Sequence, residues 1–198
     1  MLRKQLLILG LGVLLLAAGL PVAYQAWPAR TPAPVSIDQA AVQSLAQLQD
    51  QHGNPAARSL RPEQWALVFF GFTHCADICP ATLSRISRVL EQLGEAAGQL
   101  QPIFVTLDPQ RDTPAHLAAY LRFFDERILG LTGTPEQTQQ IAAAWGVYSQ
   151  QVPTGGSYLL DHSTTLFLLE PGGALSRRFS GRMDSQDLAR VIAAEQAR

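Results

Sequence analysis

"WALVFFGFTHCADICPATLSRISRVLEQL", residues 65–93, places both cysteines of the chain between a predicted strand and a predicted helix. Residues 65–70 form a short, continuous apolar run with β-forming side chains, which is typical of a strand buried on both faces. Residues 80–93 carry apolar side chains at 83, 86, 90 and 93, which predicts a helix that proline opens at its first position. We therefore expect Cys75 and Cys79 in the loop that joins the two elements.

The alternation of strand and helix continues along the chain. Residues 102–107 and 128–131 are predicted strands, each followed by a helix with a Thr-Pro start. Residues 164–169 and 174–179 are predicted strands joined by Glu-Pro-Gly-Gly, a hairpin signal, and Asp184 caps a last helix. The order β-α-β-α-β-α-β-β-α predicts an α/β, thioredoxin-like fold with parallel crossovers and an antiparallel edge.

The N-terminus departs from this globular pattern. Arg3 and Lys4 precede a run without charge at residues 6–24, close to the about 20 residues that a helix needs to cross a bilayer. A cleaved signal peptide is the alternative, but the run is longer than a usual apolar region and lacks a clean cleavage site. We divide the chain into a membrane anchor at 1–25, a proline-rich linker at 26–38 and a globular domain at 39–198.

This division predicts the location of the domain and its partners. The basic N-terminus stays in the cytoplasm, so the domain lies on the outer face of the membrane, periplasmic in a bacterium. A hydrophobic content of 47% is typical of a globular core, and a formal charge of −1 without a basic stripe argues against nucleic acid as a partner.

Two thiols at Cys-x-x-x-Cys spacing fit a disulfide staple, a redox couple or a metal clamp. Unpaired backbone N–H groups at a helix N-terminus favour negative charge, so we expect both thiols to have lowered pKa values. Thiolate character favours redox or metal chemistry over an inert staple. A structural disulfide remains an alternative, because an extracytoplasmic domain meets oxidising conditions.

An imidazole would complete a soft-metal site beside the two sulfurs, and the chain has four histidines. His52 in a turn-rich loop and His116 in the first turn of a helix are expected to be solvated. His74 adjoins Cys75, but neighbouring side chains of an extended segment point in opposite directions.

His162 precedes the strand predicted at 164–169. In a thioredoxin-like layout this segment passes in front of the cysteine loop, which places the imidazole opposite the thiols. Asp161 is interpreted either as a turn former or as an outer-shell group that orients the ring.

Four stretches resemble, in this order, the Sco/SenC family of copper chaperones: "VFFGFTHCADICPATL", "VTLDPQRDTP", "ILGLTGTPEQ" and "LLDHSTTLFLLEPGG". The resemblance covers roughly residues 48–194. It implies a thioredoxin fold, an N-terminal membrane anchor and copper, as Cu(I) or Cu(II), bound by Cys75, Cys79 and His162. Ala76 departs from the family pattern, in which proline often follows the first cysteine, but this difference removes no ligand.

The resemblance also implies partners. Members of the family help to assemble the dinuclear copper site of cytochrome c oxidase subunit II, which implies that protein or a similar copper protein as the recipient, and a copper donor. The alternative is an enzyme, a thiol–disulfide oxidoreductase that keeps the oxidase cysteines reduced. Dedicated oxidoreductases usually have Cys-x-x-Cys spacing, however, and His162 would have no purpose in one. A peroxidase and a disulfide-stapled interaction domain are weaker alternatives.

The stretch "DPQRDTP" contains three charged residues, Asp108, Arg111 and Asp112. We interpret it as a strand-to-helix turn with an ion pair or a cap. Docking of a partner is the alternative function for these side chains.

Overall fold

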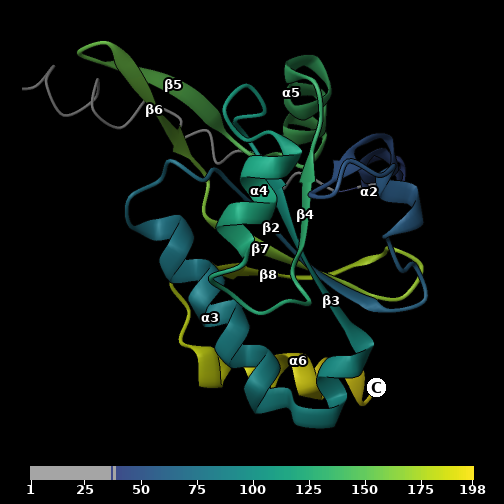
Figure 1. Cartoon of the computed structure of the whole chain (residues 1–198). Coiled ribbons are helices and arrows are strands. Elements are labelled where there is room, and N and C mark those ends of the chain that lie inside the picture. Colours follow the sequence, from purple (N-terminus) through teal and green to yellow (C-terminus); the bar gives the residue numbers. More distant parts are fainter. Residues whose placement is uncertain (1–36, 38) are drawn as a thin grey trace, which may run out of the picture. The chain divides into compact units, whose positions relative to one another are not determined.

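The structure, a computed structural model, describes residue 37 and residues 39–198 (Figure 1). The anchor predicted at 6–24 and all of the linker except residue 37 lie outside the described residues. Among the residues that are described, no helix has both the length and the apolar composition needed to cross a membrane.

The centre of the domain is a mixed six-stranded sheet in the order β1-β4-β3-β2-β7-β8. Three strands run parallel: β2 (Trp65–Gly71), β3 (Leu100–Thr106) and β4 (Leu129–Thr132). The predicted hairpin forms the antiparallel edge from β7 (Thr165–Leu169) and β8 (Leu175–Ser180), with β7 antiparallel to β2. The short strand β1 (Gln49–Asp50) closes the other edge against β4.

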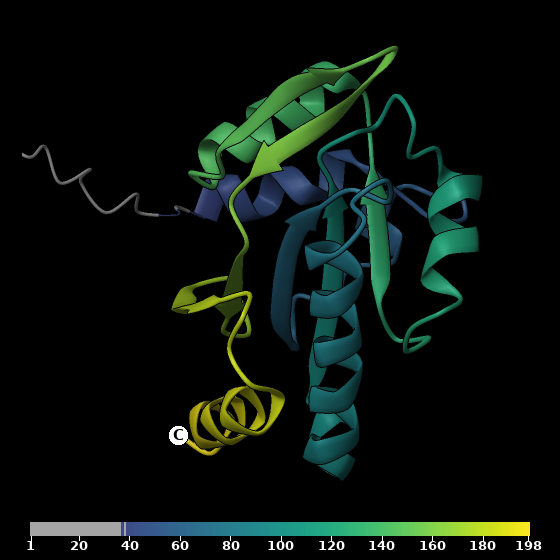
Figure 2. The same ribbon diagram turned by 90° about the vertical axis from the view of Figure 1, so that its left-hand side faces the viewer.

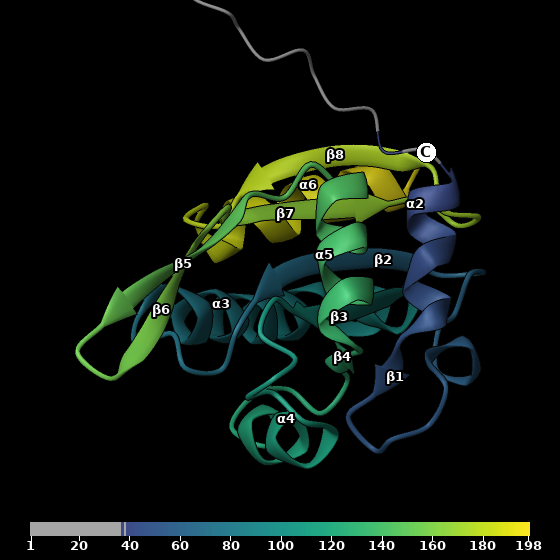
Figure 3. The same ribbon diagram turned by 90° about the horizontal axis from the view of Figure 1, so that it is seen from above.

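Helices cover both faces of this sheet (Figure 3). On one face α3 (Ile78–Leu93) packs against α6 (Ser185–Gln196), and on the other α2 (Gln39–Ser44) lies beside α5 (Pro135–Ala144). Helix α4 (Pro114–Leu121) packs beside β4. Short 3-10 helices complete the chain: η1 (Leu45–Gln47), η2 (Ala56–Arg58) and η3 (Gly94–Gln99).

The central strand β2 is buried on both faces, as its unbroken apolar run predicts. Phe69 lies 5.9 Å from Phe104, measured between ring centroids, on the face of the sheet that α3 covers. Phe70 points to the opposite face, where its ring lies 5.3 Å from that of Trp145. The end of β2 is therefore held from two sides.

Two predictions about local structure were wrong. Helix α3 begins at Ile78, so Cys79 lies in its first turn and not in the loop. Pro80 fits inside this turn because the first N–H groups of a helix have no intrahelical acceptor for proline to remove.

The second error is a missed hairpin. Strands β5 (Ser149–Thr154) and β6 (Ser157–His162) form a separate two-stranded sheet that projects beyond the end of the main sheet (Figure 2). Every residue of β5 is exposed, so the strand lacks the apolar alternation that marks a half-buried strand. The Gly155-Gly156 turn, with positive φ at both residues, is the signal that could have found it.

Candidate metal centre

The loop after β2 brings the two sulfurs together. The N–H of Cys75 donates to the carbonyl of Phe72 at 3.3 Å, and the N–H of Cys79 donates to the Cys75 Sγ at 3.4 Å. Cys75 is half-buried, whereas Cys79 is fully buried in the first turn of α3. One sulfur thus faces the surface and the other belongs to the core.

Gly71 makes room for the buried sulfur. A Cβ atom at this position would lie 2.9 Å from the Cys79 Sγ and 2.8 Å from the Phe104 ring. Contacts this short do not occur between a Cβ and its neighbours, so the approach of Cys79 to the end of β2 depends on the glycine.

His162, the last residue of β6, completes the group from the hairpin side. Its ring lies against Phe72, with 5.6 Å between centroids in an edge-to-face arrangement. The Nδ1 lies 2.8 Å from the Ser163 carbonyl oxygen, which can only accept, so Nδ1 carries the proton. The other ring nitrogen, Nε2, faces the sulfurs and lies 3.5 Å from the Cys79 Sγ.

The structure does not bring Asp161 to this ring. Asp161 is exposed and precedes His162 in a strand, where successive side chains point to opposite faces. The Ser163 carbonyl takes the place that we expected for Asp161, because it fixes the tautomer and orientation of the imidazole.

The two thiols differ in charge state, contrary to the expectation of two activated sulfurs. The pKa of Cys75 is lowered, chiefly because the Cys79 thiol donates a hydrogen bond to its sulfur, although burial opposes the shift. The pKa of Cys79 is raised, first because it makes that hydrogen bond and then because it is buried. The pair therefore holds one proton, with the negative charge on the more exposed sulfur.

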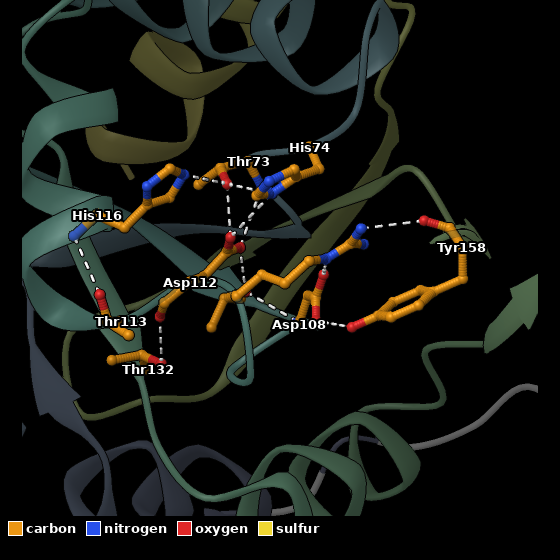
Figure 4. Close-up of polar contacts among 10 residues, drawn as sticks. Thr73, His74, Asp108, Asp112, Thr113, His116, Thr132 and Tyr158 are labelled. Atoms are coloured by element: carbon orange, nitrogen blue, oxygen red, sulfur yellow. Dashed lines mark hydrogen bonds and ion pairs between the residues drawn. The ribbon is translucent and has the colours of Figure 1, made fainter. Parts of the chain in front are cut away.

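The loop that contains Asp108 and Arg111 anchors the hairpin (Figure 4). Arg111 forms an ion pair with Asp108, as the sequence predicts, and donates to the Tyr158 carbonyl oxygen at 3.0 Å. The Tyr158 hydroxyl donates to the Asp108 Oδ1 at 2.7 Å, and the Arg111 guanidinium lies 3.8 Å from the centroid of the Tyr158 ring. Tyr158 belongs to β6, so these contacts hold the strand that carries His162.

The ligand atoms of Cys75, Cys79 and His162 all lie within 4.8 Å of one another. Two thiolates and an imidazole suit soft or borderline ions such as Cu(I) and Zn(II), and also a copper ion that changes oxidation state. Loading would remove the proton that the sulfurs share, because metal-bound cysteines are thiolates.

The other histidines lie elsewhere. His52 is exposed in the turn after β1, as expected. His74 and His116 are also exposed, but their rings stack on each other beside Asp112, and this pairing was missed because they are 42 positions apart in the sequence.

Comparison with known proteins identifies the family to which the domain belongs. The family model described as SCO1/SenC matches residues 35–196. The chain belongs to the SCO1/SenC family. Members that resemble it include the bovine protein "SCO2 homolog, mitochondrial", 38% identical over 158 residues, which are 77% of this chain and 59% of the bovine protein.

Solved SCO1/SenC structures share the fold. That of Bradyrhizobium japonicum ScoI with copper bound is 36% identical, with a TM-score of 0.68 over 74% of this chain and 94% of that chain. That of yeast Sco1 with copper bound is 34% identical, with a TM-score of 0.66 over 74% of this chain and 83% of that chain. The match spans less than two thirds of the bovine SCO2 homolog and 56% of the fission yeast protein sco1, which is 37% identical over 72% of this chain.

Proposed function

We propose that the protein is a copper chaperone in the assembly of cytochrome c oxidase. Its cargo copper binds to the Cys75 and Cys79 sulfurs and the His162 Nε2. The observation that carries the proposal is the convergence of these three atoms within 4.8 Å, in a family whose relatives include copper-bound structures. The hydrogen bond between Nδ1 and the Ser163 carbonyl supports it, because it leaves Nε2 as the ring nitrogen that a neutral imidazole would offer to a metal.

The recipient we propose is the dinuclear copper site of oxidase subunit II or a similar copper protein. A separate donor supplies the ion. Residues 6–24 hold the chain in the membrane, residues 26–38 form the linker, and the domain at 39–198 acts on the outer face. The half-exposed Cys75 is the sulfur that a recipient ligand would reach first, since Cys79 is enclosed.

The opposite pKa shifts of the thiols favour one second candidate, thiol–disulfide exchange. In this reaction the Cys75 thiolate attacks a disulfide of the recipient and releases one recipient thiolate. Cys79 then passes its proton to the released thiolate and attacks the mixed disulfide, which frees the second recipient thiolate. The recipient thus gains two electrons and this protein ends as a Cys75–Cys79 disulfide.

Substitution of His162 distinguishes the two functions. The experiment is a copper titration of the reduced full-length protein and of His162→Ala, with the sulfur and nitrogen ligands counted by X-ray absorption. A chaperone loses one nitrogen and much of its copper affinity, most of all for Cu(II), which favours nitrogen donors. The thiols of the variant still cycle between dithiol and disulfide, because exchange requires no imidazole.

His52→Ala is the matched control, since it removes an exposed imidazole far along the sequence from the site. If His162→Ala binds copper as the parent does and retains its oxidase assembly activity in cells, the chaperone proposal fails and thiol exchange is the better function.

A further inference from the structure

A second group of ligand-bearing side chains lies outside the cysteine centre (Figure 4). It consists of His74 from the loop after β2, Asp112 from the loop before α4, and His116 from the first turn of α4. One ring nitrogen from each histidine and one carboxylate oxygen of Asp112 lie within 4.8 Å of one another. The imidazole rings stack with 5.4 Å between centroids.

The carboxylate of this group is buried and lacks a strong cationic partner. The Asp112 side chain is 0% exposed, and it accepts hydrogen bonds from the Thr73 N–H at 3.0 Å and the Thr106 hydroxyl at 2.6 Å. Among the described residues, its only ion-pair contact is with the His74 ring at 3.8 Å. A buried charge without a full counter-charge is costly, so this site favours a cation.

The Thr73 hydroxyl already gathers the three groups. It donates to the Asp112 Oδ1 at 2.5 Å and lies 3.1 Å from the His74 Nδ1 and 3.0 Å from the His116 Nε2. Because its one proton goes to the carboxylate, the hydroxyl has lone pairs left for an N–H of each imidazole. After a change of tautomer, the His74 Nδ1 and the His116 Nε2 would be unprotonated. Together with one carboxylate oxygen of Asp112, they would then be available to coordinate a cation.

Neighbouring contacts fix the two ends of the group. Two hydrogen bonds hold the Asp112 Oδ2, and the Asp112 carbonyl oxygen accepts from the Thr132 hydroxyl at 2.9 Å. The His116 N–H donates to the Thr113 hydroxyl that caps α4. The imidazoles are exposed and free to adjust their side-chain angles, whereas the carboxylate is not.

We propose that His74, Asp112 and His116 form a second metal site, for a divalent transition-metal ion with nitrogen and oxygen ligands. Cu(II) is the ion that such a donor set binds most tightly among the divalent first-row metals, ahead of Ni(II) and Zn(II). The exposed side of the site leaves the remaining coordination positions to water. The site uses neither thiol nor His162, so it does not depend on the function proposed above.

Occupancy of this site would act on the cysteine loop. His74 and Cys75 are consecutive residues, about 3.8 Å apart between Cα atoms. An ion shared by His74 and His116 would tie the start of that loop to α4.

The test is a Cu(II) titration of the full-length protein with its thiols oxidised to the disulfide, so that the cysteine centre cannot compete. Binding is followed by calorimetry and by electron paramagnetic resonance, which reports nitrogen ligands. We expect one Cu(II) with two nitrogen ligands. His74→Gln and His116→Gln should each weaken binding at least about tenfold, since even outer-shell partners of a metal ligand contribute that much.

His52→Gln is the matched control, and His162→Gln shows whether the first site contributes. A Cys75→Ser, Cys79→Ser double variant repeats the titration without the disulfide, in case the bond shifts His74. Absence of Cu(II) binding in both forms overturns the proposal, as does binding that His74→Gln and His116→Gln leave unchanged or that His52→Gln weakens equally. Because His74 and His116 are exposed, both variants should retain the melting temperature of the parent.

Discussion

The two halves of the cysteine–histidine centre are held in different ways. The half that carries Cys75 and Cys79 continues into a helix from a strand whose last five residues are buried, and the Cys79 sulfur is part of the core. The half that carries His162 is a hairpin whose strand β5 is entirely exposed. Stability varies within a protein according to such differences in burial. The sulfurs should therefore keep their positions under conditions that already release the imidazole.

The largest effect should come from breaking the rigid half. Phe70→Ala removes a fully buried ring that packs against Trp145 and Phe167, and it should lower the free energy of unfolding by about 3–5 kcal/mol. Urea denaturation measures this loss. Leu159→Ala in the exposed hairpin is the control and should change the stability by less than about 0.5 kcal/mol. Equal losses in the two variants would contradict the contrast between the halves.

A smaller change acts directly beneath the buried sulfur. Gly71→Ala places a Cβ against the Cys79 Sγ and the Phe104 ring, so overpacking should cost about 1–3 kcal/mol of stability. Since Cys79 must move, copper affinity should fall as well. Gly98→Ala is the matched control, because nothing lies within 4 Å of the added Cβ there. Unchanged copper binding in Gly71→Ala would show that the approach of the sulfur does not depend on this glycine.

The histidine half should respond to loss of its anchor. Tyr158→Phe removes the hydrogen bond to Asp108, worth about 1 kcal/mol, so the hairpin should open about fivefold more often. Hydrogen exchange of the β6 amides reports this opening, while exchange in β2 should stay as in the parent. Tyr148→Phe is the control, since its hydroxyl donates to the nearby Gln150, two residues away in the chain. If β2 and β6 exchange faster together, the hairpin is not a separate unit.

The smallest expected change sharpens the contrast between the two thiols themselves. The lowered pKa of Cys75 keeps this sulfur a thiolate across the neutral range, so its alkylation by iodoacetamide should hardly vary between pH 6 and 8. An ordinary thiol below its pKa of about 8.5 reacts roughly tenfold faster with each pH unit. Cys79, whose pKa is raised, should remain unmodified. Peptide mass spectrometry distinguishes the two, and a steep profile at Cys75 would exclude a shared proton.

Much of the cysteine half follows from local sequence. The continuous apolar run of β2, the apolar stripe of α3 and the caps at Thr113, Thr134 and Asp184 are all local signals, and the structure confirms them. The edge hairpin of β7 and β8 was also predicted from its turn. Hydrophobic period and capping chemistry act within a few residues, so these elements can be read before the fold is known.

The hairpin β5–β6 was missed by periodicity because β5 is exposed along its whole length and Leu160 is the one buried residue of β6. No motif encodes the backbone geometry that starts α3 at Ile78. The same is true of the geometry that brings the Ser163 carbonyl to the His162 Nδ1. For the same reason the sequence predicted two activated thiols. The sequence showed that the cysteines lie near a helix N-terminus. It did not show that the two sulfurs differ in burial and share one proton.

The sequence by itself determined the order of the strands and helices and the resemblance of its motifs to the SCO1/SenC family. It also determined which residue types could bind a metal. Tertiary structure alone decided which of them meet. It brings His162 to cysteines more than eighty positions away and pairs His74 with His116 across a buried Asp112. The physical reason is range: propensity and periodicity act between neighbours in the chain, whereas ligand distances, burial and shared protons arise only when distant segments pack together.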